Sequence, residues 1–210
     1  MMPLEPRLDI GILIDRLQRL FRLDTSVFDE VRQDPTATVP AFLVAAVSTF
    51  LAGLGGWLWW FIQDFDDPGR VFLLSTIVGS FLSMAFWIIW LAVAWVILTQ
   101  FFHEEADWQQ MLRTMGMAAA PLALSVLMFI PGIDLGVALA SVALFFGLTT
   151  IAIQAVTPAS PARVLVANFA GFAIWATVLG LLATSDTPLA PGIFLSDAAS
   201  EELGQIFGAF

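Results

Sequence analysis

Five long apolar stretches, separated by short polar segments, dominate the pattern of the chain. A helix needs roughly 20 apolar residues to cross a bilayer core, and each stretch meets that length. Because lipid offers no partners to backbone polar groups, each stretch is expected to be an α-helix that satisfies its own hydrogen bonds. The pattern predicts an all-α, polytopic membrane helix bundle with five transmembrane helices. Their expected bounds are about 39–62, 71–102, 111–130, 135–156 and 162–183.

The second stretch is longer than a bilayer requires. At a rise of ~1.5 Å per residue it would extend roughly 48 Å, against a core of ~30 Å. No charge divides it. We therefore expect one helix that is tilted or protrudes from the membrane, with a bend near Gly79-Ser80.

Turn and capping residues lie between the stretches. Asp67-Pro68-Gly69 and Pro131-Gly132 predict turns. Asp107 and Gln110 have the spacing of a capping box, and Ser160-Pro161 is typical of a helix start.

The segment before the first stretch predicts an N-terminal amphipathic interfacial helix at about 8–23. Three basic side chains, Arg16, Arg19 and Arg22, fall on or beside its polar face. Such a helix can lie in the headgroup layer, where Arg side chains contact the membrane surface, or pack on the bundle. The apolar residues at helical spacing are Ile10, Leu13, Ile14, Leu17, Leu20 and Phe21.

The stretches divide the chain into three parts. Residues 1–38 form a cytoplasmic N-tail, 39–184 the membrane domain, and 185–210 an acidic C-terminal tail on the non-cytoplasmic side. A short helix is expected around Leu203, Ile206 and Phe207. The tail has three open roles: covering the bundle, contacting a partner, or little role at all.

Basic residues set the expected orientation. With the N-terminus in the cytoplasm, seven basic residues are cytoplasmic and only Arg70 lies on the other side, as the positive-inside rule requires. The sequence therefore predicts a multi-pass protein of the cell membrane, with short tails that favour a bacterial source. The seven are Arg7, Arg16, Arg19, Arg22, Arg32, Arg113 and Arg163.

Composition supports the membrane class and excludes several functions. The 210 residues are 59% hydrophobic and 12% charged, with a mean hydropathy of +0.88. A net charge of -10 argues against nucleic acid as a partner. The absence of cysteine excludes disulfides and thiolate chemistry.

Several short motifs occur in the order found in one membrane family. Leu17-Gln18-Arg19-Leu20-Phe21 is followed by Phe28-Asp29-Glu30-Val31-Arg32-Gln33-Asp34-Pro35. Later come the Met115–Pro121 run and Ile130-Pro131-Gly132. Together with the long, Trp-rich second span, they resemble the Yip-domain (Ypt/Rab-interacting) family of five-span membrane proteins over roughly residues 14–183.

The chain departs from the eukaryotic trafficking members of that family. It lacks a Gly-Gly pair at 103–108 and an Asp-Leu-x-Gly-Pro element. It therefore looks more like a prokaryotic-type member. The resemblance implies an integral membrane protein with a part in membrane organisation or trafficking.

Catalytic and metal chemistry have little support in the sequence. His103 is the only histidine, and on a helix only Asp107 of its acidic neighbours would share its face, so no metal site is expected. The centres of the five stretches carry no ionisable residue, which argues against a proton-coupled transporter. We expect no catalytic residues, no cofactor and no enzyme activity.

Aromatic and small residues within the stretches supply the remaining candidates. Trp87 and Trp90, spaced i and i+3 near mid-membrane, would be either a surface for a lipid tail or pigment, or packing between helices. Small residues permit close helix packing within the chain or against another membrane protein. The helix-packing glycines are Gly53, Gly56, Gly132, Gly136 and Gly171.

These observations favour a non-catalytic scaffold or interaction protein. Its partners would be membrane lipids and other membrane proteins, or a second copy of itself. Two alternatives stay open at this point. One is an accessory subunit of a larger energy-transducing or photosynthetic membrane complex, and the other is a small transporter or lipid-handling channel.

Overall fold

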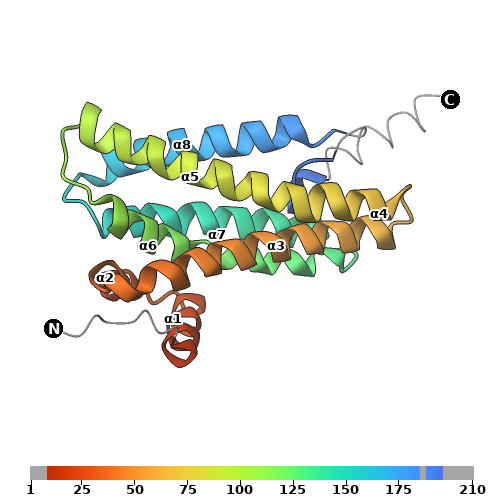
Figure 1. Cartoon of the computed structure of the whole chain (residues 1–210), viewed down its shortest axis with the longest axis horizontal. Coiled ribbons are helices and arrows are strands. Elements are labelled where there is room, and N and C mark those ends of the chain that lie inside the picture. The colour runs from red at the N-terminus through yellow and green to blue at the C-terminus, as the bar shows by residue number, and fades with distance from the viewer. Residues whose placement is uncertain (1–8, 185–187, 196–210) are drawn as a thin grey trace.

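The computed structural model describes residues 9–184 and 188–195. Within them the chain is helical apart from turns and one isolated bridge between Ala183 and Pro188. Five long helices lie side by side, and α1 stands crosswise to them beneath α3 (Figure 1). In chain order the elements are α1 (Ile10–Phe21), α2 (Val27–Gln33), η1 (Pro35–Ala37), α3 (Thr38–Ile62), α4 (Pro68–Val71), η2 (Phe72–Gly79), α5 (Ser80–Val96), η3 (Ile97–Phe101), α6 (Trp108–Ala118), η4 (Ala120–Phe129), α7 (Asp134–Gln154), α8 (Pro161–Leu182) and η5 (Gly192–Phe194).

The predicted fold class is confirmed. Five helices are long and apolar enough to cross a membrane, and the amphipathic helix before them is α1. The bounds differ from the expected ones by at most four residues, chiefly because the first span begins four residues earlier and the second and third begin three residues earlier. The spans are Pro35–Ile62, Pro68–Phe101, Trp108–Phe129, Asp134–Gln154 and Pro161–Leu182.

The second span is one continuous helix, as the sequence predicts. It contains π-helical turns over Phe72–Gly79 and again over Ile97–Phe101. The first π segment gives way to α-helix at Ser80, beside the Gly79-Ser80 pair where a bend is expected. Wider turns of this kind are uncommon and displace the side chains that follow.

The third span changes from α-helix to 3₁₀-helix at Ala119. Pro121 follows directly, and its missing N–H removes a hydrogen bond that an α-helix would need there. The 3₁₀ backbone then passes directly against α3. A Cβ added to Gly55 would lie 2.6 Å from the Cα of Val126, so only glycine permits this approach.

Three tryptophans lie near the C-terminal end of α3. Tryptophan is enriched at the ends of membrane spans. The Nε1–H of Trp57 donates to the carbonyl of Pro68 at 2.8 Å, and that of Trp60 to the carbonyl of Asp66 at 2.9 Å. Trp59 donates to the carboxylate of Asp134 at 3.1 Å. These bonds join the end of α3 to the start of α4, to the loop before α4 and to the start of α7.

Candidate functional site

Trp87 and Trp90 lie inside the bundle and not on its surface. Trp90 is fully buried, and Trp87 is 3% exposed. This burial weighs against the interpretation of the pair as a flat surface for a lipid tail or pigment. The alternative, aromatic packing between helices, is what the structure contains.

A polar network inside the membrane span holds Trp90. Its Nε1–H donates to Oδ1 of Asn168 at 2.9 Å. The amide nitrogen of Asn168 then donates to the hydroxyls of Thr150 at 2.8 Å and Thr149 at 3.1 Å. Because no water is available at this depth, each polar group needs such a partner. The network joins α5, α7 and α8.

Rings pack around the same tryptophan. The Trp90 ring centroid lies 5.0 Å from that of Phe145 and 5.3 Å from that of Phe172, both edge-on. Gly171 makes room for the indole, since a Cβ added there would lie 2.6 Å from the Trp90 carbonyl oxygen. The predicted helix-packing role of Gly171 is therefore confirmed. This contact also explains how α8 approaches α5 so closely.

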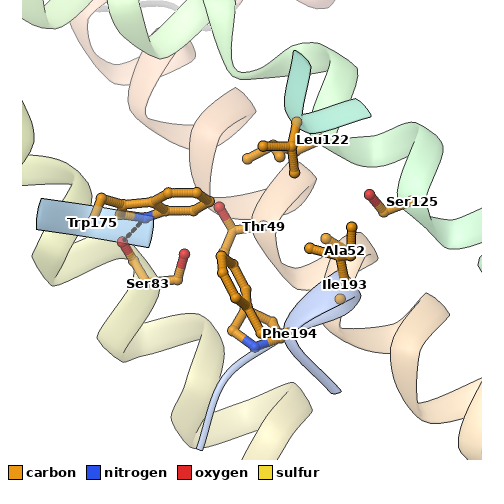
Figure 2. Close-up of a pocket in the computed structure, with 11 residues that line it drawn as sticks. Thr49, Ala52, Ser83, Leu122, Ser125, Trp175, Ile193 and Phe194 are labelled. Carbon is orange, nitrogen blue, oxygen red and sulfur yellow. Dashed lines mark hydrogen bonds between the residues drawn. The ribbon is translucent and has the colours of Figure 1, made fainter. Parts of the chain in front are cut away.

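A narrow seam runs through the centre of the bundle, with Thr49, Ser83, Ser125, Trp175 and Phe194 among its walls (Figure 2). Its volume is about 20 Å³. A space of this size admits about one water molecule and no organic ligand. Trp175 donates its Nε1–H to the carbonyl of Ser83 at 3.2 Å.

The segment 188–195 closes that seam at one end of the bundle. Phe194 packs on Trp175 with ring centroids 5.5 Å apart. Ala190 and Leu195 are fully buried, and the carbonyl of Ala190 accepts a hydrogen bond from Ser75 at 2.8 Å. Of the three roles considered for the tail, this part has the first, covering the bundle. The helix expected around Leu203 lies outside the described residues.

Gly53 and Gly56 both pack closely within the chain, against a neighbouring helix and against the C-terminal segment. A Cβ on Gly53 would lie 3.1 Å from the Cα of Thr76 in the neighbouring helix. A Cβ on Gly56 would lie 3.0 Å from the carbonyl oxygen of Gly192. The small residues of α3 thus accommodate the C-terminal segment as well as a helix.

Gly132 and Gly136 do not pack within the chain, so for these two positions only packing against another membrane protein remains as a prediction. An added Cβ at either position meets no atom within 4 Å. Gly132 has a φ of +90°, a backbone conformation that favours glycine in the turn before α7. Gly136 lies one turn into α7, on an exposed face.

The basic residues of α1 are engaged within the chain. Arg16 forms an ion pair with Asp34 at 2.9 Å, and Arg19 pairs with Asp24 at 2.8 Å and Glu30 at 2.7 Å. The hydroxyl of Ser26 and the guanidinium of Arg19 lower the pKa of Asp24 to about 2. These pairs fix α1 to the residues that follow it. They also weaken the attraction of Arg16 and Arg19 for anionic lipid, while Arg22 is exposed.

Arg113 has a role that the sequence did not reveal. The sequence indicates only a cytoplasmic charge near the start of the third stretch, whereas in the structure Arg113 lies in α6 and is 6% exposed. Its guanidinium donates to the hydroxyl of Thr38 and the carbonyl of Arg32, each at 3.0 Å, and to Gln109 at 3.2 Å. It therefore joins α6 to the segment that leads into α3. Its capping-box neighbour Asp107 gave the only signal, by placing the helix start upstream of it.

The flank of the bundle carries a much larger hollow, which we call the α1–α3 groove. Its volume is about 390 Å³. Apolar side chains of α1 and α3 form its walls, and small residues of η4 contribute to the lining. The lining residues are Leu13, Leu17, Phe21, Leu43, Val44, Val47, Ser48, Leu51, Ala120 and Ala123.

The acidic cluster around His103 contains no metal-binding arrangement in the part of the chain that the structure describes. Instead, Glu104 forms an ion pair with Arg163 at the start of α8. The guanidinium of Arg163 also lies over the ring of Phe102, 5.6 Å from its centroid. Through these two contacts, the loop after the second span packs against the start of the fifth span.

Comparison with known proteins gives no relative for this chain: no protein-family model, no curated protein and no solved structure matches it.

Proposed function

We propose that this protein is a non-catalytic membrane scaffold or interaction protein, with a part in membrane organisation or trafficking, as the resemblance to Yip-domain proteins implies. One observation carries the proposal: space for a ligand lies on the outside of the bundle and not within it. The central seam holds about 20 Å³, whereas the α1–α3 groove on the flank holds about 390 Å³.

The positions of the ionisable residues support a role without transport or catalysis. In the five spans these residues are Arg70, Arg113, Asp134 and Arg163, and each lies within the first six residues of its span. Intramembrane paths for protons or ions are usually lined by such groups at depth. Their placement at the span ends weighs against a proton-coupled transporter.

The arginines also support an orientation with the N-terminus in the cytoplasm of a bacterial cell. Five spans put the described N-terminal segment at the same end as the loops near 102–107 and 155–160. That end holds Arg16, Arg19, Arg22, Arg32, Arg113 and Arg163, and the opposite end holds Arg70. An excess of arginine marks the cytoplasmic side.

The outer surface supports a role in binding other membrane proteins or a second copy. Large apolar side chains such as Phe81 (76% exposed) and Leu181 (73% exposed) project from the spans. In a membrane these side chains contact either lipid or another helix. A helix of another protein replaces lipid where its surface packs closely against them.

The test is chemical cross-linking in native membranes, followed by purification of the full chain in mild detergent. We expect a membrane protein, or a second copy, that co-purifies in fixed stoichiometry and depends on lipid-facing residues such as Phe81. A monomer that moves a solute across liposomes would overturn the proposal.

A further inference from the structure

The α1–α3 groove is built from two rows of apolar side chains. Leu13, Leu17 and Phe21 recur every four residues along α1, so they share one face of that helix. Leu43, Val47 and Leu51 have the same spacing on α3. α1 crosses the spans (Figure 1). The hollow lies between the two rows.

Small residues give the groove its depth. Ala120 and Ala123 of η4 contribute to the lining between the two rows, and both have only a methyl side chain. Ala120 is buried and Ala123 is half-buried. A larger residue at 123 would project into the hollow.

The open side of the groove faces hydrocarbon. Val47 is 54% exposed and Leu43 is 40% exposed, and both belong to a membrane-spanning helix. Phe21 on the opposite wall is 54% exposed. Apolar side chains so exposed on a span contact the acyl chains of the bilayer.

Water is a poor occupant of this space. An ordered water needs two to four polar partners. Ser48 supplies the single polar side chain among the ten lining residues. If the groove were empty, the side chains of its walls would lose dispersion contacts. A flexible apolar chain would restore these dispersion contacts and needs no hydrogen-bond partner.

Charges near the groove do not favour a particular headgroup. Arg16 and Arg19, on the same helix as one wall, are held by Asp34, Asp24 and Glu30. Arg22 is exposed but is not part of the groove lining. We therefore expect recognition to come from the fit of the chain and not from the charge of the lipid.

We propose that the α1–α3 groove holds one acyl chain of a phospholipid, clamped between the amphipathic helix and the first span. The phospholipid belongs to the leaflet on the N-terminal side of the bundle. The inference rests on the membrane-spanning fold and not on the scaffold proposal. A protein without protein partners would still bind the lipid.

The experiment is native mass spectrometry of the full-length chain released from mild detergent. The protein is first reconstituted in vesicles of phosphatidylcholine or phosphatidylglycerol. We expect one phospholipid that stays bound at collision energies that remove the other lipids, to a similar extent for both headgroups. A strong preference for phosphatidylglycerol would contradict recognition by the chain alone.

Two variants fill the groove. Ala123→Leu projects from the lining, and Val47→Trp closes the mouth from a position that is more than half exposed and so tolerates a large side chain. Each should lower the retained phospholipid by about tenfold. Ala143→Leu, on an exposed face of α7 outside the groove, is the matched control and should retain it.

The results of these experiments distinguish a phospholipid chain from a second copy of the protein as the occupant of the groove. Equal retention by the wild-type chain and both groove variants would overturn the proposal. So would a dimer that Val47→Trp dissociates, since the occupant would then be a second copy. Neither result depends on whether a partner protein co-purifies.

Discussion

The indole N–H of Trp90 and the side-chain oxygen of Asn168 are 2.9 Å apart, and both residues are fully buried. One is on α5 and the other on α8, separated by 78 positions in the sequence. A polar pair at this depth makes the arrangement of three helices specific, because any shift leaves a donor without an acceptor.

Replacing Asn168 by Leu should destabilise the protein by about 1–2 kcal/mol, because Trp90 would lose its acceptor. Thermal unfolding in detergent would measure the change. Thr177→Val is the control, since Thr177 is exposed on the same helix. A variant as stable as the wild type would show that Trp90 finds another acceptor.

Replacing Gly171 by alanine should lower the stability of the protein, whereas replacing Gly136 by alanine should raise it. Gly171→Ala forces a methyl group against Trp90 and should cost about 1–3 kcal/mol. Gly136→Ala meets nothing and should raise stability by up to about 1 kcal/mol, because alanine is the better helix former. The comparison uses one unfolding assay. The same sign at both positions would contradict the packing described here.

Gly56→Leu should displace the segment 188–195 from the bundle, since the new side chain would collide with Gly192 and Leu195. The chain has no cysteine, so Ala190→Cys gives a single reactive probe. Ala190 is fully buried, and a maleimide should label Cys at 190 slowly. Adding Gly56→Leu should speed the labelling, whereas Gly69→Ala, which meets no neighbour, should not.

Acid should loosen the attachment of α1. Asp24 has its pKa lowered from 3.8 to about 2, so its contribution to stability is full above about pH 5 and is lost progressively as the pH falls through 2. A spin label on a single cysteine at Ile12 should gain mobility over that range. Asp24→Asn should show the mobile state at neutral pH. Mobility independent of pH in the wild-type chain would contradict the role of this carboxylate.

Single cysteines also test the orientation. Asp66→Cys lies in the loop between the first two spans, and Glu105→Cys in the loop between the second and third. A membrane-impermeant maleimide applied to intact cells should label the first and not the second. Labelling of Glu105→Cys alone would reverse the assignment, and labelling of both would contradict the five spans.

The sequence predicted the number of helices and their class because hydrophobic length is a local property. The starts of α6 and α8 followed from Asp107 and Pro161 for the same reason. Contacts between distant segments were not predictable. The sequence left two interpretations of Trp90, a surface for a ligand or packing between helices, since periodicity does not show which neighbour a helix face meets. In the same way, nothing in the sequence shows that Asn168 accepts a hydrogen bond from Trp90.

The glycines show the same limit. Gly53, Gly56, Gly132, Gly136 and Gly171 look alike in the sequence. Only the folded chain shows that Gly171 packs against an indole and that Gly132 lies in a turn. It also shows that Gly56 packs against a segment more than 130 positions later in the sequence. The α1–α3 groove escaped prediction because its two walls are separated by the loop and short helices between residues 22 and 37, whose path fixes where α1 lies.

The closure of the central seam by residues 188–195 has a consequence for biogenesis. A nascent chain emerges from the N-terminus, so all five spans leave the ribosome before Ala190, Gly192 and Leu195 do. Until then the faces of Gly53, Gly56 and Gly79 have no cover from that segment. The bundle is therefore assembled in two stages, with membrane insertion first and sealing last. A chain that stopped before residue 188 would therefore leave these glycine faces uncovered.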